Sequence, residues 1–359
     1  MQASEKRKLG SADLEVPVMG FGGAPLGNMY DGFSDEQARA TVRSAYDLGL
    51  RFFDTAPLYG FGLSEHRVGE ALRWQDRESY VLSTKVGRLL KPADPATLDG
   101  GLFARILPFE GVYDYSYDGA MRSVEASLQR LQTDYIDLYQ LHWPNRGSYH
   151  FRKYWDWDPH DLELGDVDGE IADMLGEVQK LQSEGKLKHF GLSNETAWGT
   201  RKWLEASERH GLPRVVSIQN EYSLICRIFD LDLAEVAVHE KVGLLAYSPL
   251  GASALSGKYL DGAIPAGSRR SMQPNLNGRY TAQAEQAIAR YSEVAARHGL
   301  DLAQMALAFC LTRPFMTSVI IGATSMHQLK TNLAAANVEL GDDVMADILK
   351  VFRDLPRPM

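Results

Sequence analysis

Residues 34–56 read SDEQARATVRSAYDLGLRFFDTA, and this stretch decides the fold. Apolar residues recur at helical spacing from Ser34 to Gly49, which predicts an amphipathic helix that ends at a glycine. Residues 51–56, RFFDTA, then have the apolar and aromatic composition of a short buried strand. The stretch therefore predicts one helix followed by one strand.

The same alternation continues along the chain, with seven more runs of strand composition. Strands that alternate with helices form parallel sheets, and a TIM barrel needs eight of them. The other predicted strands are VPVMGFG (16–22), YVLSTKV (80–86), YIDLYQLH (135–142), KHFGLSN (188–194), VVSIQN (215–220), GLLAYSPL (243–250) and SVIIGA (318–323), and further amphipathic helices are predicted at 117–132, 171–186 and 196–211.

A doubly wound open sheet is the alternative fold. It would usually carry a glycine-rich phosphate turn after its first strand, but GFGGAPLGN (20–28) does not fit GxGxxG. Because no linker or low-complexity segment divides the chain, we predict one α/β domain over residues 1–359, a (β/α)8 barrel. Long connections at 87–115, 145–168 and 251–279 follow predicted strand ends, where a barrel carries its active-site loops.

The composition narrows the function classes. The 359 residues are 45% apolar and carry a net charge of -9, which disfavours a nucleic-acid partner and leaves a small molecule as the expected one. Without an 18-residue apolar run or an apolar N-terminal signal, we expect a cytoplasmic protein without a membrane partner. Cys226 and Cys310 lack CxxC spacing, so we predict neither a disulfide framework nor a zinc site. The oligomeric state stays open.

Four polar residues are predicted at the ends of three successive strands: Asp54, Tyr59, Lys85 and His142. An ordinary tyrosine pKa is about 10, and a neighbouring ammonium lowers it. We expect Lys85 to do this for Tyr59, and Asp54 to keep Lys85 protonated. His142 would orient a substrate oxygen.

Together, these groups could protonate a carbonyl oxygen while hydride arrives at its carbon. Taken singly, Lys85 or His142 could equally be a structural polar residue of the barrel. A metal-dependent hydrolase would need several histidine and acidic ligands, and only His142 and Asp54 qualify. We therefore predict no metal.

FDTAPLYG around Asp54 and Tyr59, STKVG around Lys85 and LYQLHWP around His142 resemble the aldo-keto reductases, and the resemblance covers nearly the whole chain. It implies an NADP(H)-dependent oxidoreductase that reduces aldehydes and ketones to alcohols. Tyr59 would be the general acid, assisted by the other three residues. Substrate contacts would come from Tyr59, His142 and Trp143.

Three later segments, GLSNET, SIQNEYS and AYSPLG, resemble cofactor-binding segments of that family. By this resemblance Tyr247 stacks on the nicotinamide, and Ser193, Asn194 and Gln219 bind its carboxamide. The full implied set is Gly23, Ser193, Asn194, Gln219, Tyr247, Ser248, Pro249, Leu250, Gly257, Lys258, Arg269, Gly322, Thr324, Gln328 and Asn332.

The late segment departs from the common family pattern, so the choice of NADP(H) rests on the loop that precedes it. Many members carry a lysine and an arginine where this chain has Gly322 and Gln328. The branch of potassium-channel β subunits and Tas-like proteins resembles this chain there and takes its cations from the preceding loop. That loop here offers Lys258, Arg269 and Arg270, and paired cations suit a phosphate dianion.

The two parts of the chain resemble different branches. Residues 20–123 resemble D-threo-aldose (L-fucose) and pyridoxal dehydrogenases, whereas the chain from RLQTDYIDLYQLHWPNR onward resembles Tas-like and channel-β-like reductases. An engineered chimera with a junction between Leu128 and Tyr135 is one hypothesis. A natural intermediate sequence is the other.

The substrate is predicted only by class. The loops after the third and fourth strands predict an aromatic-lined pocket suited to aldehydes. A sugar-lactol (aldose) 1-dehydrogenase running in the oxidative direction is the close alternative. A nucleotide-sensing protein like the channel β subunits is the alternative from another class. The loop aromatic residues are Phe103, Phe109, Tyr113, Tyr115, Tyr149, Phe151, Tyr154, Trp155 and Trp157.

Overall fold

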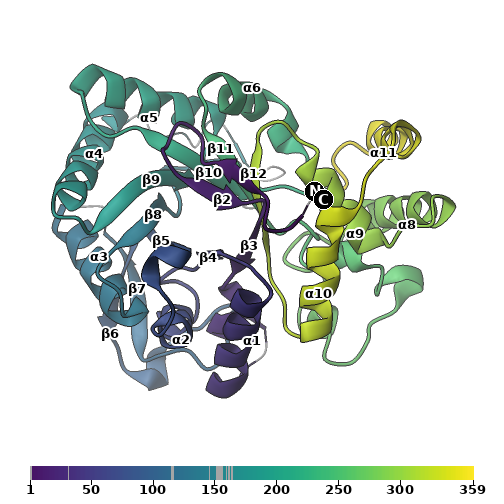
Figure 1. Cartoon of the computed structure of the whole chain (residues 1–359), viewed down its shortest axis with the longest axis horizontal. Helices are drawn as coiled ribbons and strands as arrows, with labels where there is room; N and C mark the ends of the chain where they lie inside the picture. Colours follow the sequence, from purple (N-terminus) through teal and green to yellow (C-terminus); the bar gives the residue numbers. More distant parts are fainter. Residues whose placement is uncertain are drawn as a thin grey trace.

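The computed structural model describes residues 2–30, 32–114, 117–144, 146–150, 157–158, 160, 162 and 165–359. Eight parallel strands close into a barrel, as the alternation of strands and helices predicts, so the (β/α)8 fold is confirmed (Figure 1). In barrel order they are β3 (Met19–Gly22), β4 (Phe52–Asp54), β5 (Val81–Val86), β8 (Ile136–Leu141), β9 (Leu187–Ser193), β10 (Val215–Glu221), β11 (Gly243–Tyr247) and β12 (Met316–Ile321).

Helices surround this barrel in Figure 1. The first, α1, begins after a capping box in which Ser34 accepts from the Gln37 backbone and Gln37 reaches back to Ser34, and it buries Ala38, Val42 and Ala45. The helices are α1 (Asp35–Asp47), α2 (Leu63–Leu72), α3 (Tyr117–Leu131), α4 (Val167–Ser183), α5 (Ala197–His210), α6 (Asp232–His239), α7 (Arg269–Met272), α8 (Ala282–Arg297), α9 (Leu302–Leu311), α10 (Met326–Ala334) and α11 (Asp342–Asp354).

The predicted first strand, 16–22, is wrong as a single element. It divides into β2 (Glu15–Pro17), which pairs antiparallel with β1 (Lys6–Lys8), and β3, which enters the barrel. Pro17 has no N–H to donate and therefore cannot continue a strand that is paired on both sides. The β1–β2 hairpin instead closes the bottom of the barrel, where Leu9 and Val16 are fully buried.

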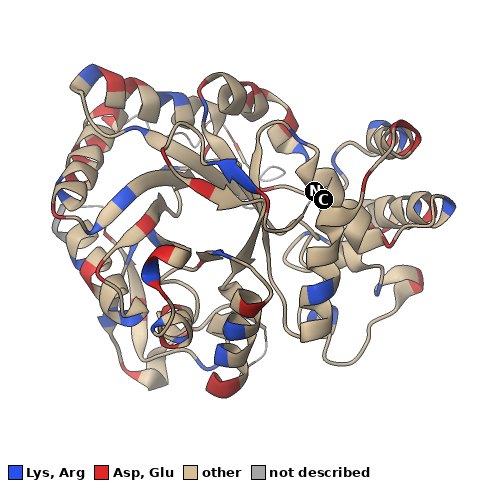
Figure 2. Ribbon diagram, viewed as in Figure 1, with Lys and Arg blue, Asp and Glu red and all other residues tan. Residues whose placement is uncertain are grey.

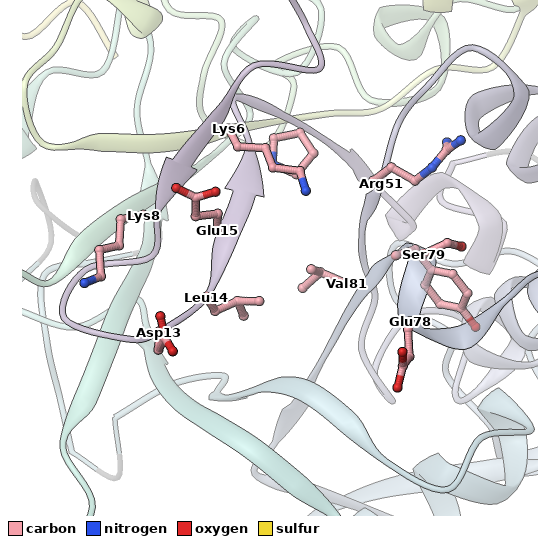
Figure 3. Close-up of a pocket in the computed structure, with 11 residues that line it drawn as sticks. Lys6, Lys8, Asp13, Leu14, Glu15, Arg51, Glu78, Ser79 and Val81 are labelled. Atoms are coloured by element: carbon pink, nitrogen blue, oxygen red, sulfur yellow. The ribbon is translucent and has the colours of Figure 1, made fainter.

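A pocket of about 460 Å³ remains between this hairpin and the starts of the barrel strands (Figure 3). Three basic residues, Lys6, Lys8 and Arg51, and three acidic residues, Asp13, Glu15 and Glu78, line it together with Leu14, Pro17, Ser79, Tyr80 and Val81. Charges of both signs line this bottom pocket in equal number, so its formal net charge is zero.

Three loops meet above the opposite end of the barrel. The 87–115 connection contains an antiparallel hairpin, β6 (Arg88–Pro92) and β7 (Phe109–Tyr113), which the sequence analysis did not predict. In the same connection, the Leu102 carbonyl accepts a hydrogen bond of 2.8 Å from the backbone N–H of Tyr30, in the loop after β3. Asn277, in the 251–279 connection, donates to the Tyr30 hydroxyl at 2.7 Å. These contacts enclose the carboxyl ends of the strands.

Polar contacts span the segment where the two family resemblances meet. Arg77, which precedes β5, donates to the Thr133 hydroxyl at 2.9 Å, the Tyr135 carbonyl at 2.9 Å and the Asp137 carboxylate at 2.7 Å. The two parts of the chain are therefore joined by specific hydrogen bonds as well as by apolar packing. In the described part of the chain, no helix combines the length and the apolar character needed to cross a bilayer.

Candidate active site

Asp54 and Lys85 form a buried ion pair at the carboxyl end of the barrel. Asp54 ends β4 and Lys85 lies on the adjacent β5, and the Lys85 Nζ is 2.7 Å from Asp54 Oδ2. The same Nζ donates to the Thr55 carbonyl at 2.9 Å. Parallel pairing of β4 with β5 brings these residues together, although 31 positions separate them in the sequence.

The second carboxylate oxygen of Asp54 accepts three further hydrogen bonds. Its donors are Ser83 Oγ at 3.0 Å, Gln140 Nε2 at 3.1 Å and Gln219 Nε2 at 3.0 Å. Ser83 and Gln140 were not predicted, although a polar residue within an otherwise apolar strand is a signal that could have identified both. Gln219 was predicted to bind the carboxamide of the cofactor. In the structure, its side-chain N–H donates a hydrogen bond to Asp54.

Tyr59 lies beside the ion pair, with the Lys85 Nζ 5.1 Å from its ring centroid. Burial raises the pKa of Tyr59 and Lys85 lowers it, and the net direction is upward. The prediction that the pKa of Tyr59 lies below its ordinary value is therefore wrong. Desolvation of the hydroxyl raises this pKa by more than the Lys85 ammonium lowers it. Burial alone would lower the pKa of Lys85, but Asp54 and Tyr59 raise it, so the amine stays protonated.

His142 follows β8 and faces Tyr59. The two rings are 5.9 Å apart and nearly perpendicular, and the imidazole stacks on Trp143 at 3.7 Å. Burial, with the cations of Lys85 and Arg88, holds the pKa of His142 well below its ordinary value. The imidazole is therefore neutral at physiological pH and can offer one N–H to a substrate oxygen.

A cavity of about 840 Å³ opens above these residues. Asp54, Tyr59, His142 and Trp143 line it, whereas Lys85 lies beneath them, 1% exposed. Most of the residues proposed for the cofactor also line it: Ser193, Asn194, Gln219, Tyr247, Ser248, Pro249, Leu250, Lys258, Arg269, Gly322, Thr324, Gln328 and Asn332.

The two remaining glycines of the proposed cofactor set lie next to lining residues but do not themselves line the cavity. A Cβ at Gly23 would approach Ser64 Oγ to 2.7 Å and the Asp54 carbonyl to 3.0 Å, so a side chain there would disturb the backbone beside Asp54. Gly257 has a φ of +76°, in the left-handed region that favours glycine.

A chain of hydrogen bonds orders the polar wall between β9 and β11. The Tyr247 hydroxyl donates to Asn194 Oδ1 at 2.7 Å, and Asn194 Nδ2 donates to the His142 carbonyl at 2.9 Å. Ser193 Oγ donates to the Gln219 carbonyl at 2.8 Å. Amide and hydroxyl groups that face one cavity wall provide both donors and acceptors, which suits a carboxamide ligand.

The three predicted phosphate-binding cations of the 251–279 connection do not all line the cavity. Lys258 and Arg269 line the cavity, and neither forms an ion pair within the described residues. Burial lowers the pKa of Arg269, as expected of a cation without a carboxylate partner. Arg270 instead lies over the Tyr280 ring at 3.9 Å, outside the cavity lining. A phosphate group would supply the anion that Lys258 and Arg269 lack, so the donor set fits a phosphorylated nucleotide.

The predicted aromatic wall is smaller than expected. Phe103 lines the cavity 6.1 Å from the Tyr59 ring, together with Trp143, Tyr30 and Phe33. Four other candidates lie outside the lining: Phe109, Tyr113, Tyr149 and Trp157. The predictions for Tyr115, Phe151, Tyr154 and Trp155 fall outside the described residues. Within the described ranges, no three histidine, cysteine or acidic residues cluster as metal ligands would.

Residues 18–352 match the aldo/keto reductase family, and the chain belongs to it. It is 38% identical to the protein Tas of Escherichia coli over 95% of this chain and 96% of that protein. It is 31% identical to pyridoxal 4-dehydrogenase of Microbacterium luteolum, over 96% of each chain, and 26% identical to D-threo-aldose 1-dehydrogenase of Pseudomonas sp, over 97% of each. The structure of a glycerol dehydrogenase from Gluconobacter oxydans has the same fold, with a TM-score of 0.75 and 23% identity over 99% of this chain and 97% of that one.

The resemblances to Tas, aldose dehydrogenase and pyridoxal dehydrogenase are thus confirmed. Each of these relatives aligns with at least 95% of the chain, so none stops between Leu128 and Tyr135. A junction there stays a hypothesis, which comparison of each half separately would test.

Proposed function

We propose that this aldo/keto reductase reduces aldehydes and ketones to alcohols with NADP(H). The observation that carries the proposal is that Tyr59, His142 and Asp54 line one cavity, with Lys85 paired to Asp54 beneath them. The cavity continues from these groups to Lys258 and Arg269, which is where a nucleotide phosphate would bind.

Tyr59, Lys85, Asp54 and His142 each have a separate role in the proposed reduction. A reduced nicotinamide supplies hydride to the carbonyl carbon when it is bound. The Tyr59 hydroxyl gives its proton to the carbonyl oxygen, and its raised pKa keeps that proton in place until negative charge develops. The Lys85 ammonium, which Asp54 holds, stabilises the resulting phenolate. The neutral imidazole of His142 donates a second hydrogen bond to the same oxygen.

NADP(H) rather than NAD(H) is proposed because Lys258 and Arg269 both line the cavity without a carboxylate partner in the described chain. A 2′-phosphate dianion would neutralise both charges, whereas a ribose hydroxyl would leave them unpaired. Ser193, Asn194 and Gln219 would face the carboxamide, and Tyr247 the nicotinamide ring.

Oxidation of an aldose at its anomeric carbon is the second candidate, and the likeness to D-threo-aldose 1-dehydrogenase favours it. The same groups would act in reverse, with the Tyr59 oxygen accepting the proton of the hydroxyl. The polar groups of the β9–β11 wall could bind sugar hydroxyls.

Three further observations support the proposed domain organisation, partners and location of the enzyme. The family match over residues 18–352 supports one domain for the whole chain. Basic and acidic residues are interspersed on the outer helices in Figure 2, which supports the absence of a nucleic-acid or membrane partner. Cys226 and Cys310 are buried and form no disulfide within the described residues, which agrees with a cytoplasmic protein.

Substitution of Tyr59 by Phe tests the proposal. The variant should bind NADPH as the parent does, followed by cofactor fluorescence, and lose about 100-fold or more of its carbonyl reduction. Aldehydes and aldoses are compared as substrates in both directions. Full activity in Tyr59→Phe would refute the mechanism. Cofactor binding by the parent chain without turnover of any substrate would favour a nucleotide-sensing protein.

A further inference from the structure

Arg88 is a cation beside the active site that the proposed reaction does not use. It begins β6 directly after Gly87, whose φ of +117° turns the chain away from the end of β5. Its Nη2 donates to the Tyr113 hydroxyl at 2.6 Å, and its Cζ lies 5.3 Å from the ring centroid of Trp143. In the described residues it forms no ion pair, and its buried Nε has no hydrogen-bond partner.

His142, by contrast, is held through its ring faces. No side chain or backbone group of the described residues makes a hydrogen bond to its ring nitrogens, which leaves both for a ligand. The imidazole stacks on Trp143 at 3.7 Å with 22° between the planes, and the Tyr59 ring lies nearly perpendicular to it at 5.9 Å. The orientation of the imidazole therefore depends on the orientation of the indole.

We propose that Arg88 is a positioning residue for carbonyl reduction: it holds the indole of Trp143 and thereby fixes the imidazole of His142 toward the substrate oxygen. This inference rests on the proposed function of His142. A cation packed against an aromatic ring contributes modestly on an exposed surface and more where water is excluded. Arg88 lies between these two cases, because its Nε is buried whereas its hydrogen bond to Tyr113 is exposed.

The charge of Arg88 has a second consequence. The charged and titratable groups around His142 come from three elements: Lys85 on β5, with Asp54 behind it, Tyr59 after β4, and Arg88 on β6. Burial lowers the pKa of His142 most, and the two cations lower it further. Loss of Arg88 should therefore raise the pKa of His142 and move the acid limb of the pH–rate profile toward neutrality.

Arg88→Met is compared with Arg88→Lys and with Lys91→Met, which removes an exposed cation from the same hairpin. We expect Arg88→Met to lose about tenfold in kcat, with NADPH affinity and thermal midpoint close to the parent values. Its acid limb in kcat/KM should lie at higher pH than that of the parent. Arg88→Lys should keep the acid limb in place, because it keeps the charge, and Lys91→Met should match the parent in every respect.

NMR titration of His142, assigned with His142→Gln, measures the same effect without turnover. A higher pKa of His142 in Arg88→Met shows that Arg88 acts on the imidazole even if no carbonyl substrate is found, which separates the failure of this inference from that of the proposed function. An unchanged pKa of His142 together with an unchanged kcat, or equal shifts in Lys91→Met, would overturn it.

Discussion

The Lys85 ammonium lies 2.7 Å from Asp54 Oδ2, and both side chains are buried at the carboxyl end of the barrel. Neither charge can be solvated by bulk water, so each depends on the other and on the hydrogen bonds around them. Three neutral donors hold Oδ1 of Asp54 while Lys85 takes Oδ2. The carboxylate thus fixes the position and the charge of the ammonium that faces Tyr59.

Asp54→Asn should therefore lower kcat/KM by about 100-fold, because Lys85 then loses its counter-charge and stabilises the Tyr59 phenolate less well. Asp137→Asn is the matched control, since Asp137 is also a buried carboxylate paired with cations, Arg77 and Lys188, but lies on the first half of β8. Steady-state kinetics and thermal unfolding of both variants check the prediction. Equal kcat/KM losses in the two variants would contradict it.

Arg269→Ala should weaken NADPH binding by about tenfold or more, with little effect on NADH, because only NADPH carries the 2′-phosphate. Arg270→Ala provides the control from the neighbouring position, since Arg270 lies against Tyr280 outside the cavity lining. Fluorescence titration with both cofactors measures the two dissociation constants. A parallel loss for NADPH and NADH would instead indicate that Arg269 supports the loop rather than the phosphate.

Glu221 and Arg279 form a bidentate buried ion pair that ties the end of β10 to the 251–279 connection, with Nε–Oε1 at 2.5 Å and Nη2–Oε2 at 2.9 Å. Arg279→Met should cost about 3–5 kcal/mol of unfolding free energy, because Glu221 is left buried and unpaired. The double variant with Glu221→Gln should recover part of this loss. Denaturant unfolding of the single and double variants measures the coupling, and strictly additive losses would disprove it.

The protein should lose stability as the pH falls from 7 to 5. Desolvation lowers the pKa of four histidines: the buried His142, the half-buried His150, which reaches about 4, the half-buried His189 and the more exposed His66. Below pH 6.5 the unfolded chain binds more protons at these sites than the folded chain, so the free energy of unfolding decreases. For a chain of 359 residues, each kcal/mol lost lowers the thermal midpoint by roughly 1–2 °C.

Calorimetry at several pH values tests this trend, with His142→Gln expected to flatten it and the exposed His210→Gln expected not to. A midpoint that rises between pH 7 and pH 5 would contradict the lowered pKa values of these histidines.

The eight strands and four of the helices, α1, α3, α4 and α5, followed from the sequence, because hydrophobic periodicity is a local property of the chain. The same pattern placed Asp54, Tyr59, Lys85 and His142 on one face, since parallel strands share the direction of their carboxyl ends. Local patterns also misplaced one element: the 16–22 run is continuous in composition, yet Pro17 divides it between the bottom hairpin and the barrel.

Only the tertiary structure decided how these residues act on one another. The partners of Asp54 come from three strands, and Gln140 and Gln219 reach it across 86 and 165 positions of sequence. The pKa of Tyr59 rises because burial outweighs the nearby ammonium, and burial exists only in the folded chain. Likewise, Arg269 lines the cavity while adjacent Arg270 lies on Tyr280. The sequence determines which polar residues lie at the strand ends. The distances between these residues and their desolvation determine the chemistry of the site, and both arise only when remote segments pack together.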